Sequence, residues 1–326
     1  MSGRVFGWRR FGLLAGAGGA VMALTSMLTA AVAFADADDP LSGSETAIIL
    51  GGTGEPTPSL AFAQAAENLY LHPLGFDGGA TSSTVCDMVA TDPCAAPLQV
   101  LTTPELFQQG PSSVTDADDV VLAVRNEFDA NPGAFDAEHP LTIFGYSQSA
   151  TAESIAMTQL AQDGIPSADL HFVFIGDPSL PGGIGPNLVP DLDLVYGHGS
   201  SQENAILTAL GMDSAVEHVT PNDLYPTTIY TLDGDGIADF QQDFTAGGFM
   251  NALINVFTTH TAYLGLTATQ IADATTSVDG DLTTIDISDN INTLDALIGA
   301  VEHGLASSGA FDSLFQSLEL YLTNMF

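Results

Sequence analysis

Short apolar runs alternate with amphipathic segments along most of this chain. The apolar runs are rich in β-branched and aromatic residues, which is typical of buried strands. The segments between them repeat their apolar positions at helical spacing. This alternation predicts an α/β fold with a largely parallel central sheet and helices on both faces. The predicted strands are 46–50, 98–101, 141–146, 170–175 and 227–232. The predicted helices are 59–71, 114–133, 149–164 and a last one that begins at 247 and runs into a histidine segment ending at 264.

The pattern changes after about residue 266. A polar stretch is followed by leucine, isoleucine and phenylalanine residues at helical spacing up to the end of the chain. We therefore expect an α/β domain over residues 46–266 and a C-terminal extension of amphipathic helices over residues 267–326. The extension is expected to pack on the domain or on a partner. Its polar face is acidic, which argues against a helix that lies on a membrane surface.

Residues 1–35 have the order of a signal peptide. A basic start with Arg4, Arg9 and Arg10 precedes an apolar run, and the small-residue segment Ala33-Phe34-Ala35 precedes the first acidic residues. This order predicts export with cleavage after Ala35. The alternative is an uncleaved N-terminal anchor, because the apolar run is just long enough to span a bilayer. The expected location is thus outside the cell or in the cell envelope, and membrane-anchored if the leader stays in place.

The charge of the chain is strongly negative. The 326 residues include 40 acidic and four basic side chains. Three of the four arginines lie in the leader, so Arg125 alone faces forty acids in the remainder, a net charge of −39. Nucleic acid is excluded as a partner, because phosphate binding requires a basic surface. An anionic lipid surface would repel the protein as well, so the charge is best explained as a solubilising surface.

The chain has two cysteines, Cys86 and Cys94. An even count at short spacing behind a signal peptide predicts one disulfide that closes a small loop. A metal site at these cysteines would need further ligands, and no histidine or aspartate pair lies beside them at a suitable spacing.

The strand "LTIFGY" ends at Ser147, and a helix follows at once. A strand that turns sharply into a helix with serine at the turn is the nucleophile-elbow arrangement. Gly145 and Ser149 provide the small residues that this turn needs two positions before and after the serine. The N-terminus of the helix would also favour a developing negative charge. The alternative is a serine that only caps the helix.

A serine nucleophile needs a base and an acid that orients the base. In α/β folds of this kind the chain order is serine, acid, histidine. His260 follows the helix after the last predicted strand and is the expected base. The competing histidines are His198, His218 and His303, which lie in loops or on the C-terminal extension.

Asp235 follows the predicted strand 227–232 and is the expected acid. Asp233 and Asp239 share its loop, and Asp177 follows the preceding strand, so these three remain alternatives. The spacing of the loop acids also resembles a calcium loop, but the bidentate glutamate of a complete calcium site is missing. No metal and no organic cofactor is expected for the reaction.

The glycine-rich stretch "GGTGEPTPS" follows the first predicted strand. It lacks the lysine and the spacing of a phosphate-binding loop. Backbone N–H groups at this position could form half of an oxyanion hole, so we expect Thr53 to contribute beside the N–H of Gln148. The alternative is an ordinary turn from strand to helix.

Five segments in this order resemble the PE-PPE domain, a serine-hydrolase module of mycobacterial-type exported proteins. They are "IILGGTGEPTPS", "FGYSQSA", "FIGDPSLPGGI", "DGIADF" and "NALINVFTTHTAYL", and the likeness covers residues 46–266. The resemblance implies an α/β-hydrolase fold related to cutinases and esterase activity on acyl esters, with some members similar to acyltransferases that build trehalose-type envelope glycolipids. It also implies that Ser147 is the nucleophile, His260 the base and Asp235 the acid.

The chain departs from the family pattern in two places. A signal-like segment, and no PE or PPE helical domain, precedes the module. The acid loop also has an extra "LDG" before Asp235, which leaves Asp233 open as the acid.

The expected function is therefore that of an exported serine esterase that acts on acyl esters or lipids through an acyl-enzyme. Two alternatives remain at this point: an acyltransferase that builds envelope glycolipids, and a secreted binding protein on a hydrolase fold that lacks activity. Peripheral association with the cell envelope is expected, and the oligomeric state is unknown.

Overall fold

The computed structural model describes residues 39–78, 83–288 and 293–303. Contacts divide the chain into Met1–Ala35 and Asp36–Phe326. The predicted leader lies outside the described residues, as does most of the predicted C-terminal helix from residue 304 onward. All that follows concerns the second unit.

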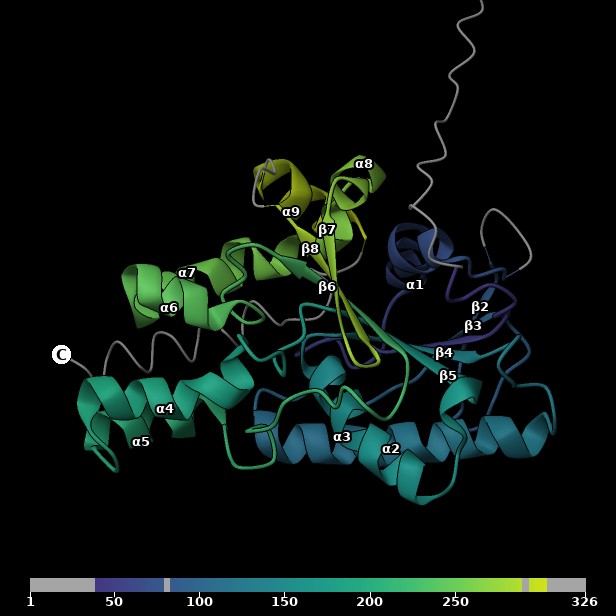
Figure 1. Cartoon of the computed structure of the whole chain (residues 1–326), viewed down its shortest axis with the longest axis horizontal. Coiled ribbons are helices and arrows are strands. Elements are labelled where there is room, and N and C mark those ends of the chain that lie inside the picture. The colour runs from purple at the N-terminus through teal and green to yellow at the C-terminus, as the bar shows by residue number, and fades with distance from the viewer. Residues whose placement is uncertain (1–38, 79–82, 289–292, 304–326) are drawn as a thin grey trace, which may run out of the picture. The chain divides into compact units, whose positions relative to one another are not determined.

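An eight-stranded sheet forms the centre of the described residues (Figure 1). The order of its strands is β2-β3-β1-β4-β5-β6-β8-β7, and every neighbouring pair is parallel except β7 with β8. This confirms the predicted α/β class with a largely parallel sheet. The strands are β1 (Ala47–Ile49), β2 (Val85–Asp87), β3 (Leu98–Val100), β4 (Leu141–Tyr146), β5 (Leu170–Ile175), β6 (Thr227–Leu232), β7 (Thr275–Asp279) and β8 (Leu282–Ile287).

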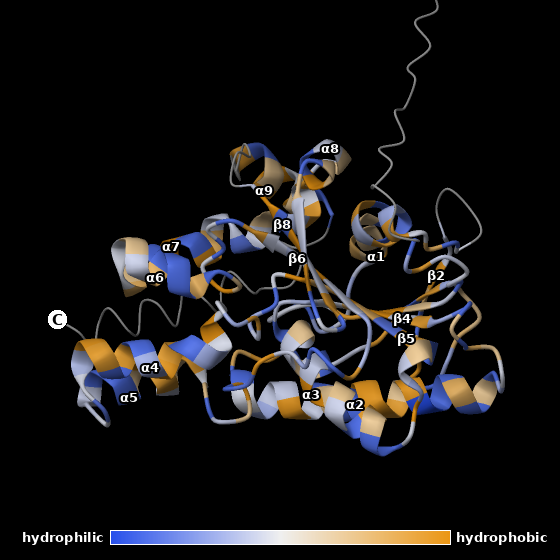
Figure 2. Cartoon of the chain, viewed as in Figure 1, coloured by the Kyte–Doolittle hydropathy of each residue, from blue (hydrophilic) through white to orange (hydrophobic). Residues whose placement is uncertain are grey.

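Alternating side chains of the central strands point into two hydrophobic cores, one on each face of the sheet. In β4, Phe144 and Tyr146 face one core, and Leu141 and Ile143 face the other. The first core is covered by α1 (Leu60–Ala66), the 3-10 helix η4 (His260–Gly265), α8 (Ala268–Ala272) and α9 (Thr293–Glu302). The second is covered by α2 (Gln109–Ala130) and α3 (Gln148–Gln162), along which hydrophobic and hydrophilic residues alternate (Figure 2). Helices therefore cover both faces, as predicted.

The chain changes direction across the sheet between β1 and β4. From β1 the chain runs first to the edge strand β2 and then to β3, which lies between β2 and β1; after α2 it places β4 on the other side of β1. Because the neighbouring strands are parallel, the carboxyl ends of β1, β4, β5 and β6 meet at one edge of the sheet. A crevice at such a reversal point is where open α/β sheets bind ligands.

Four helices form a third, smaller hydrophobic cluster beyond this edge. They are two helical pairs, α4 (Ile184–Tyr196) with α5 (Ser201–Leu210), and α6 (Phe240–Gly247) with α7 (Phe249–Thr258) (Figure 1). The cluster is centred on residues such as Leu188, Ile206 and Phe240, and it is separate from the two cores that flank the sheet. Among the helices of the described residues, none is both long and apolar enough to cross a bilayer.

The C-terminal region begins differently from the prediction. The expected helical extension starts at residue 267, but β7 and β8 lie beyond that point and complete the central sheet. β8 pairs with β6 over its full length, so the sheet continues past residue 266. Residues 275–287 belong to the polar stretch for which the sequence analysis predicts no strand, yet they form β7 and β8, because half-buried threonine and aspartate side chains suffice at the margin of the sheet. Gly280, at the turn between the two strands, has a φ of +61°, a conformation that glycine adopts without strain.

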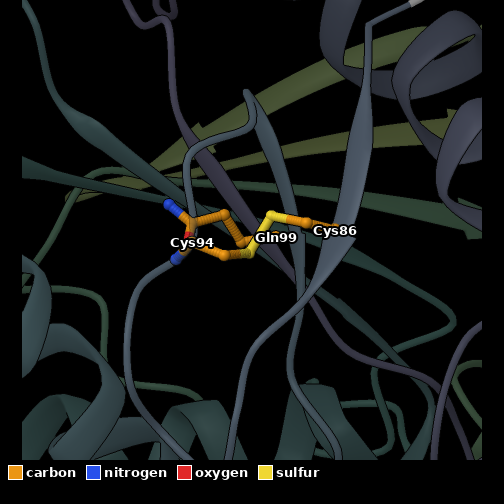
Figure 3. The surroundings of a disulfide bond; sticks show 3 residues. All are labelled: Cys86, Cys94 and Gln99. Carbon is orange, nitrogen blue, oxygen red and sulfur yellow. A yellow bond between two sulfur atoms is a disulfide. The ribbon is translucent and has the colours of Figure 1, made fainter.

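Cys86 and Cys94 form a disulfide, as the sequence predicts (Figure 3). Cys86 lies on edge strand β2, and the backbone N–H of Cys94 donates a hydrogen bond of 2.7 Å to the side chain of Gln99 on β3. The disulfide therefore ties the loop after β2 to the outer part of the sheet, away from the edge where β1 and β4 end.

Candidate active site

Ser147 lies at the bend between β4 and α3. Its backbone has φ 58° and ψ −115°, a region that non-glycine residues rarely adopt. The strained turn directs the side chain away from the sheet at the carboxyl end of β4. Ser147 is the N-cap of α3, yet its side chain forms no capping hydrogen bond. The structure therefore disfavours the alternative in which this serine only caps the helix.

Small residues surround the bend at each of the positions that the sequence indicated. A Cβ on Gly145 would lie 2.5 Å from Oε1 of Glu153 and 3.0 Å from the backbone nitrogen of Ala150, so any larger residue would require the Glu153 side chain to shift. Ser149 is buried and turns back toward the chain: its Oγ accepts a hydrogen bond from the N–H of Tyr146 at 2.8 Å. Serine can therefore occupy this place, because its hydroxyl bonds to the turn itself.

His260 is the first residue of η4, and its imidazole lies beside Ser147. Its Nε2 lies 2.8 Å from Oγ of Ser147. The ring of Tyr146 stacks on the imidazole, and the hydroxyl of Tyr146 donates to the carbonyl of His260 at 2.7 Å. A Cβ on Gly176 would lie 2.8 Å from Cε1 of His260, and Gly176 has a φ of +59°. Tyr146 thus holds the imidazole by stacking, and Gly176 leaves room for the ring. The sequence analysis did not identify either residue.

Asp235 contacts the other nitrogen of this histidine. Both carboxylate oxygens lie 2.9 Å from Nδ1 of His260, and Asp235 is fully buried. The N–H groups of Ile237 and Ala238 donate to its Oδ1 at 2.8 and 3.2 Å. Burial acts to raise the pKa of Asp235, but the charge and hydrogen bond of His260 and the other donors outweigh it and lower the pKa below 3.8. An ionised carboxylate only accepts hydrogen bonds, so Nδ1 donates and Nε2 is left to accept from the hydroxyl of Ser147.

The competing acids lie elsewhere. Asp233 is exposed. The carboxylate of Asp239 accepts from the N–H of Gly234 at 3.1 Å. Asp177 is buried and accepts from the hydroxyl of Thr220 at 2.6 Å and from the N–H of Ser179 at 2.8 Å. Of the candidate acids, Asp235 is the one that hydrogen-bonds to His260.

The competing histidines bond to groups away from Ser147. His198 contacts Asp193, and His218 and His303 contact the backbone carbonyls of Ala215 and Leu264. None of these contacts involves the elbow.

The loop acids considered for calcium do not form a converging set. Among the described residues, the group whose possible ligand atoms lie within 4.8 Å of one another is Asp193, His198 and Glu203. Glu203 already accepts hydrogen bonds from two backbone N–H groups at the start of α5, and His198 is exposed. Exposed groups of this kind are common without a metal.

Thr53 and Gln148 lie on either side of the bend. Gln148 is the first residue of α3, and the backbone of Gly52 passes so close that an added Cβ would lie 3.2 Å from Cβ of Ser147. The hydroxyl of Thr53 accepts from the side chain of Gln109 at 3.1 Å, which ties its loop to α2. Within the described part of the chain, the hydrogen bonds include none from the backbone N–H of Thr53 or Gln148. Both N–H groups are thus available to a ligand.

A cavity of about 190 Å³ opens at Ser147 and His260. Polar groups line it near the bend, among them Thr53 and Gln109. Farther out it extends between the two helical pairs, where its walls are apolar. The apolar wall includes Ile184, Ile206, Leu210, Leu253, Val256 and Phe257.

A largely parallel sheet with a serine elbow at its reversal point, and with an aspartate and a histidine from later segments beside it, defines an α/β-hydrolase fold. Residues 95–291 match the PE-PPE domain, and the chain belongs to this family. This confirms the resemblance that the sequence motifs indicated.

Two curated relatives come from Mycobacterium tuberculosis. The chain is 30% identical to the uncharacterized PPE family protein PPE28 over 74% of its own length and 32% of the relative. It is 31% identical to the esterase PE16 over 71% of its own length and 39% of the relative. The chain thus spans about a third of the length of these relatives.

A cutinase-like protein from Cryptococcus sp. is among the similar solved structures. It is 20% identical, with a TM-score of 0.34 over 67% of this chain and 89% of the other.

Proposed function

We propose that this protein is a serine hydrolase that cleaves acyl esters through an acyl-enzyme on Ser147. The observation that carries the proposal is the continuous chain of hydrogen bonds from Asp235 through His260 to Ser147 at the mouth of an apolar cavity. An isolated serine hydroxyl is a weak nucleophile, and an adjacent base with an orienting acid is what activates it. The relationship to an esterase of the same family supports the same class of reaction.

In the first half-reaction, Oγ of Ser147 attacks the carbonyl carbon of the ester while Nε2 of His260 takes its proton. The carbonyl oxygen becomes an oxyanion, for which the N–H groups of Thr53 and Gln148 are the proposed donors. The bond between the carbonyl carbon and the alcohol oxygen then breaks, and His260 returns the proton to the leaving alcohol. The acyl group remains on Ser147.

In the second half-reaction, water replaces the alcohol. His260 takes a proton from water as the water oxygen attacks the acyl carbon, and the bond to Oγ breaks as Ser147 regains its proton. Throughout both steps Asp235 stays ionised and stabilises the imidazolium. A sugar hydroxyl that took the place of water would make the protein an acyltransferase.

The apolar wall of the cavity supports an alkyl chain as the acyl part of the substrate. Four helices supply this wall, and each buried methylene group of a ligand contributes about 0.8 kcal/mol to binding. The polar groups near Ser147 leave the ester itself in a polar setting. An ester or lipid with an apolar acyl chain therefore fits the cavity better than a charged substrate.

The test is hydrolysis of a series of p-nitrophenyl esters of increasing acyl length. We expect turnover by the wild-type protein and loss of turnover in Ser147→Ala and His260→Ala, with thermal unfolding unchanged within a few degrees. A second measurement adds a sugar whose hydroxyl competes with water for the acyl group, and it follows acyl transfer to the sugar by mass spectrometry. A folded wild-type protein that turns over no ester and transfers no acyl group would overturn the proposal.

We also propose that the protein works outside the cytoplasm. The disulfide supports this, because such bonds persist in oxidising compartments, and so does the signal-like order of residues 1–35. Mass spectrometry of the protein from culture medium and from the envelope fraction tests it. A chain that begins at Asp36 is expected, and a full-length chain confined to the cytoplasm would contradict the proposal.

A further inference from the structure

A buried tyrosine hydroxyl lies beneath Asp235. The hydroxyl of Tyr263 donates a hydrogen bond of 2.7 Å to Oδ2 of Asp235, and the side chain is fully buried. Tyr263 follows His260 by three residues in the same 3-10 helix, η4. One turn of chain therefore brings both the imidazole and this hydroxyl to the same carboxylate.

The direction of this hydrogen bond is fixed by the backbone. The N–H of Leu232, at the end of β6, donates to the hydroxyl oxygen of Tyr263 at 2.9 Å. A backbone N–H can only donate, so the hydroxyl uses its oxygen to accept there and its hydrogen to donate to Asp235. The result is a chain of donors that runs from Leu232 through Tyr263 to Asp235 and meets His260 on the other side of the carboxylate.

We propose that Tyr263 is a positioning residue for the reaction: its hydroxyl holds the Asp235 carboxylate ionised and in the orientation that presents both oxygens to Nδ1 of His260. This proposal rests on the proposed function of the site. Tyr263 does not line the cavity, so it acts through Asp235 and touches no substrate.

The electrostatics of the pair agree with this role. Burial, followed by the negative charge of Asp235, raises the pKa of Tyr263 well above 10, so the hydroxyl keeps its proton and remains a donor. The hydrogen bond from Tyr263 is among the interactions that lower the pKa of Asp235 against the effect of burial. Hydrogen bonds to a charged acceptor are the strong ones, which makes this hydroxyl a larger influence than a neutral contact would be.

A neighbouring tyrosine, Tyr230, provides a matched control. Tyr230 is also fully buried, and its hydroxyl donates to the backbone carbonyl of Tyr70 at 3.3 Å. Removal of that hydroxyl deletes the same atom from the same kind of environment, but leaves Asp235 untouched. A purely structural role for Tyr263 predicts that both variants behave alike.

The experiment compares Tyr263→Phe and Tyr230→Phe in the full chain. For Tyr263→Phe we expect kcat for ester hydrolysis to fall ten- to a hundredfold with KM unchanged. We also expect activity to be lost at a higher pH on the acid side, because Asp235 takes up a proton more readily without the hydroxyl. The low-field proton resonance of the hydrogen bond between His260 and Asp235 should shift. Tyr230→Phe should keep the wild-type kcat, pH profile and resonance.

The resonance separates this proposal from the proposed function. If wild type cleaves no ester, the proposed function fails, and a shifted resonance in Tyr263→Phe still supports the positioning role. If wild type is active and Tyr263→Phe matches it in kcat, pH profile and resonance, the positioning role is overturned and the proposed function stands.

Tyr263→Phe also removes the acceptor for the N–H of Leu232, so it risks loss of folding. For that case, 3-fluorotyrosine at position 263 keeps the hydroxyl and makes it a stronger donor. A resonance displaced from that of wild type supports the proposal, and an unchanged resonance overturns it.

Discussion

Nε2 of His260 lies 2.8 Å from Oγ of Ser147, although 113 positions separate the two residues in the chain. The contact forms because the strands that precede them end at the same edge of the sheet. Ser147 follows β4 directly, and η4 brings His260 back over that edge after β6 and α7. The arrangement of the parallel strands therefore brings these distant residues together.

A comparison of Asp235→Asn with Asp233→Asn should show which aspartate of this loop acts on His260. Asparagine keeps the size of the side chain but removes the charge that orients His260, so we expect kcat for ester hydrolysis to fall about 10³- to 10⁴-fold. Asp233→Asn, at an exposed position, should retain kcat within a few-fold of wild type. Steady-state kinetics of the two variants checks this, and a greater loss in Asp233→Asn would move the acid's role to that residue.

Alanine substitutions at two glycines test whether the imidazole of His260 needs the space that Gly176 leaves at the end of β5. A methyl group at Gly176 would lie 2.8 Å from the imidazole, whereas at Gly164 nothing lies within 4 Å; both have positive φ. Alanine at either site therefore costs about 1 kcal/mol of backbone strain, but only at Gly176 does it displace the histidine. We expect Gly176→Ala to stay folded but to lose roughly a hundredfold in kcat, and Gly164→Ala to keep the wild-type kcat. Equal activities would contradict this role for Gly176.

The serine elbow and its contact with His260 were predictable because their signals are local. Gly145, Ser147 and Ser149 lie within five residues at the end of an apolar run, and His260 follows the last helix of the strand–helix alternation. The choice of acid was less determined, because three aspartates share one loop and their burial depends on distant parts of the chain. Asp235 is distinguished by its contact with Tyr263 and by the N–H groups of the loop, which no spacing rule reveals.

The hairpin of β7 and β8 shows a different limit. Its residues are mostly threonine and aspartate, and their polarity suggested a linker. The signal that was available is the Asp-Gly pair of "VDGDL", which is typical of a hairpin turn between β-branched runs. Because β8 packs beside β6 near the margin of the sheet, buried positions are interspersed with half-buried ones and replace the continuous apolar run of the central strands.

Stability should fall as the pH rises from about 4 to 6. Burial raises the pKa of Asp177 from 3.8 to about 6, and burial followed by the charge of Asp177 raises the pKa of Glu153 well above 4.5. The folded state thus binds more protons than the unfolded state in this window, and it loses stability as these groups ionise. For Asp177, which is fully buried, the shift corresponds to about 3 kcal/mol.

Glu153→Gln removes one of these titrations. Both carboxylate oxygens of Glu153 lack hydrogen-bond partners among the described residues, so the neutral amide avoids the ionisation that high pH imposes. We expect its thermal midpoint to exceed that of wild type at pH 8 and to approach it at pH 4.5, whereas the exposed Glu138→Gln should follow wild type throughout. A midpoint in Glu153→Gln that is lower than wild type at pH 8 would contradict this account.

The contact between η4 and α9 should influence activity from outside the cavity. A Cβ on Gly265 would lie 1.7 Å from the carbonyl oxygen of Ala296, so Gly265→Ala forces α9 away from the 3-10 helix that carries His260. We expect at least a tenfold loss of kcat together with a lower thermal midpoint. Leu294→Ala, on the exposed face of α9, should change neither. Full activity in Gly265→Ala would show that α9 does not hold His260 in place.

The central claim is that the geometry around Ser147 makes its hydroxyl reactive, and covalent labelling tests this most directly. The protein is treated with a fluorophosphonate probe, digested and analysed by mass spectrometry, beside Ser147→Ala and the untreated protein. The account predicts one probe per chain, located on the peptide that contains Ser147, and no label in Ser147→Ala. A folded wild-type protein that stays unlabelled, or that carries the label at another residue, would contradict it.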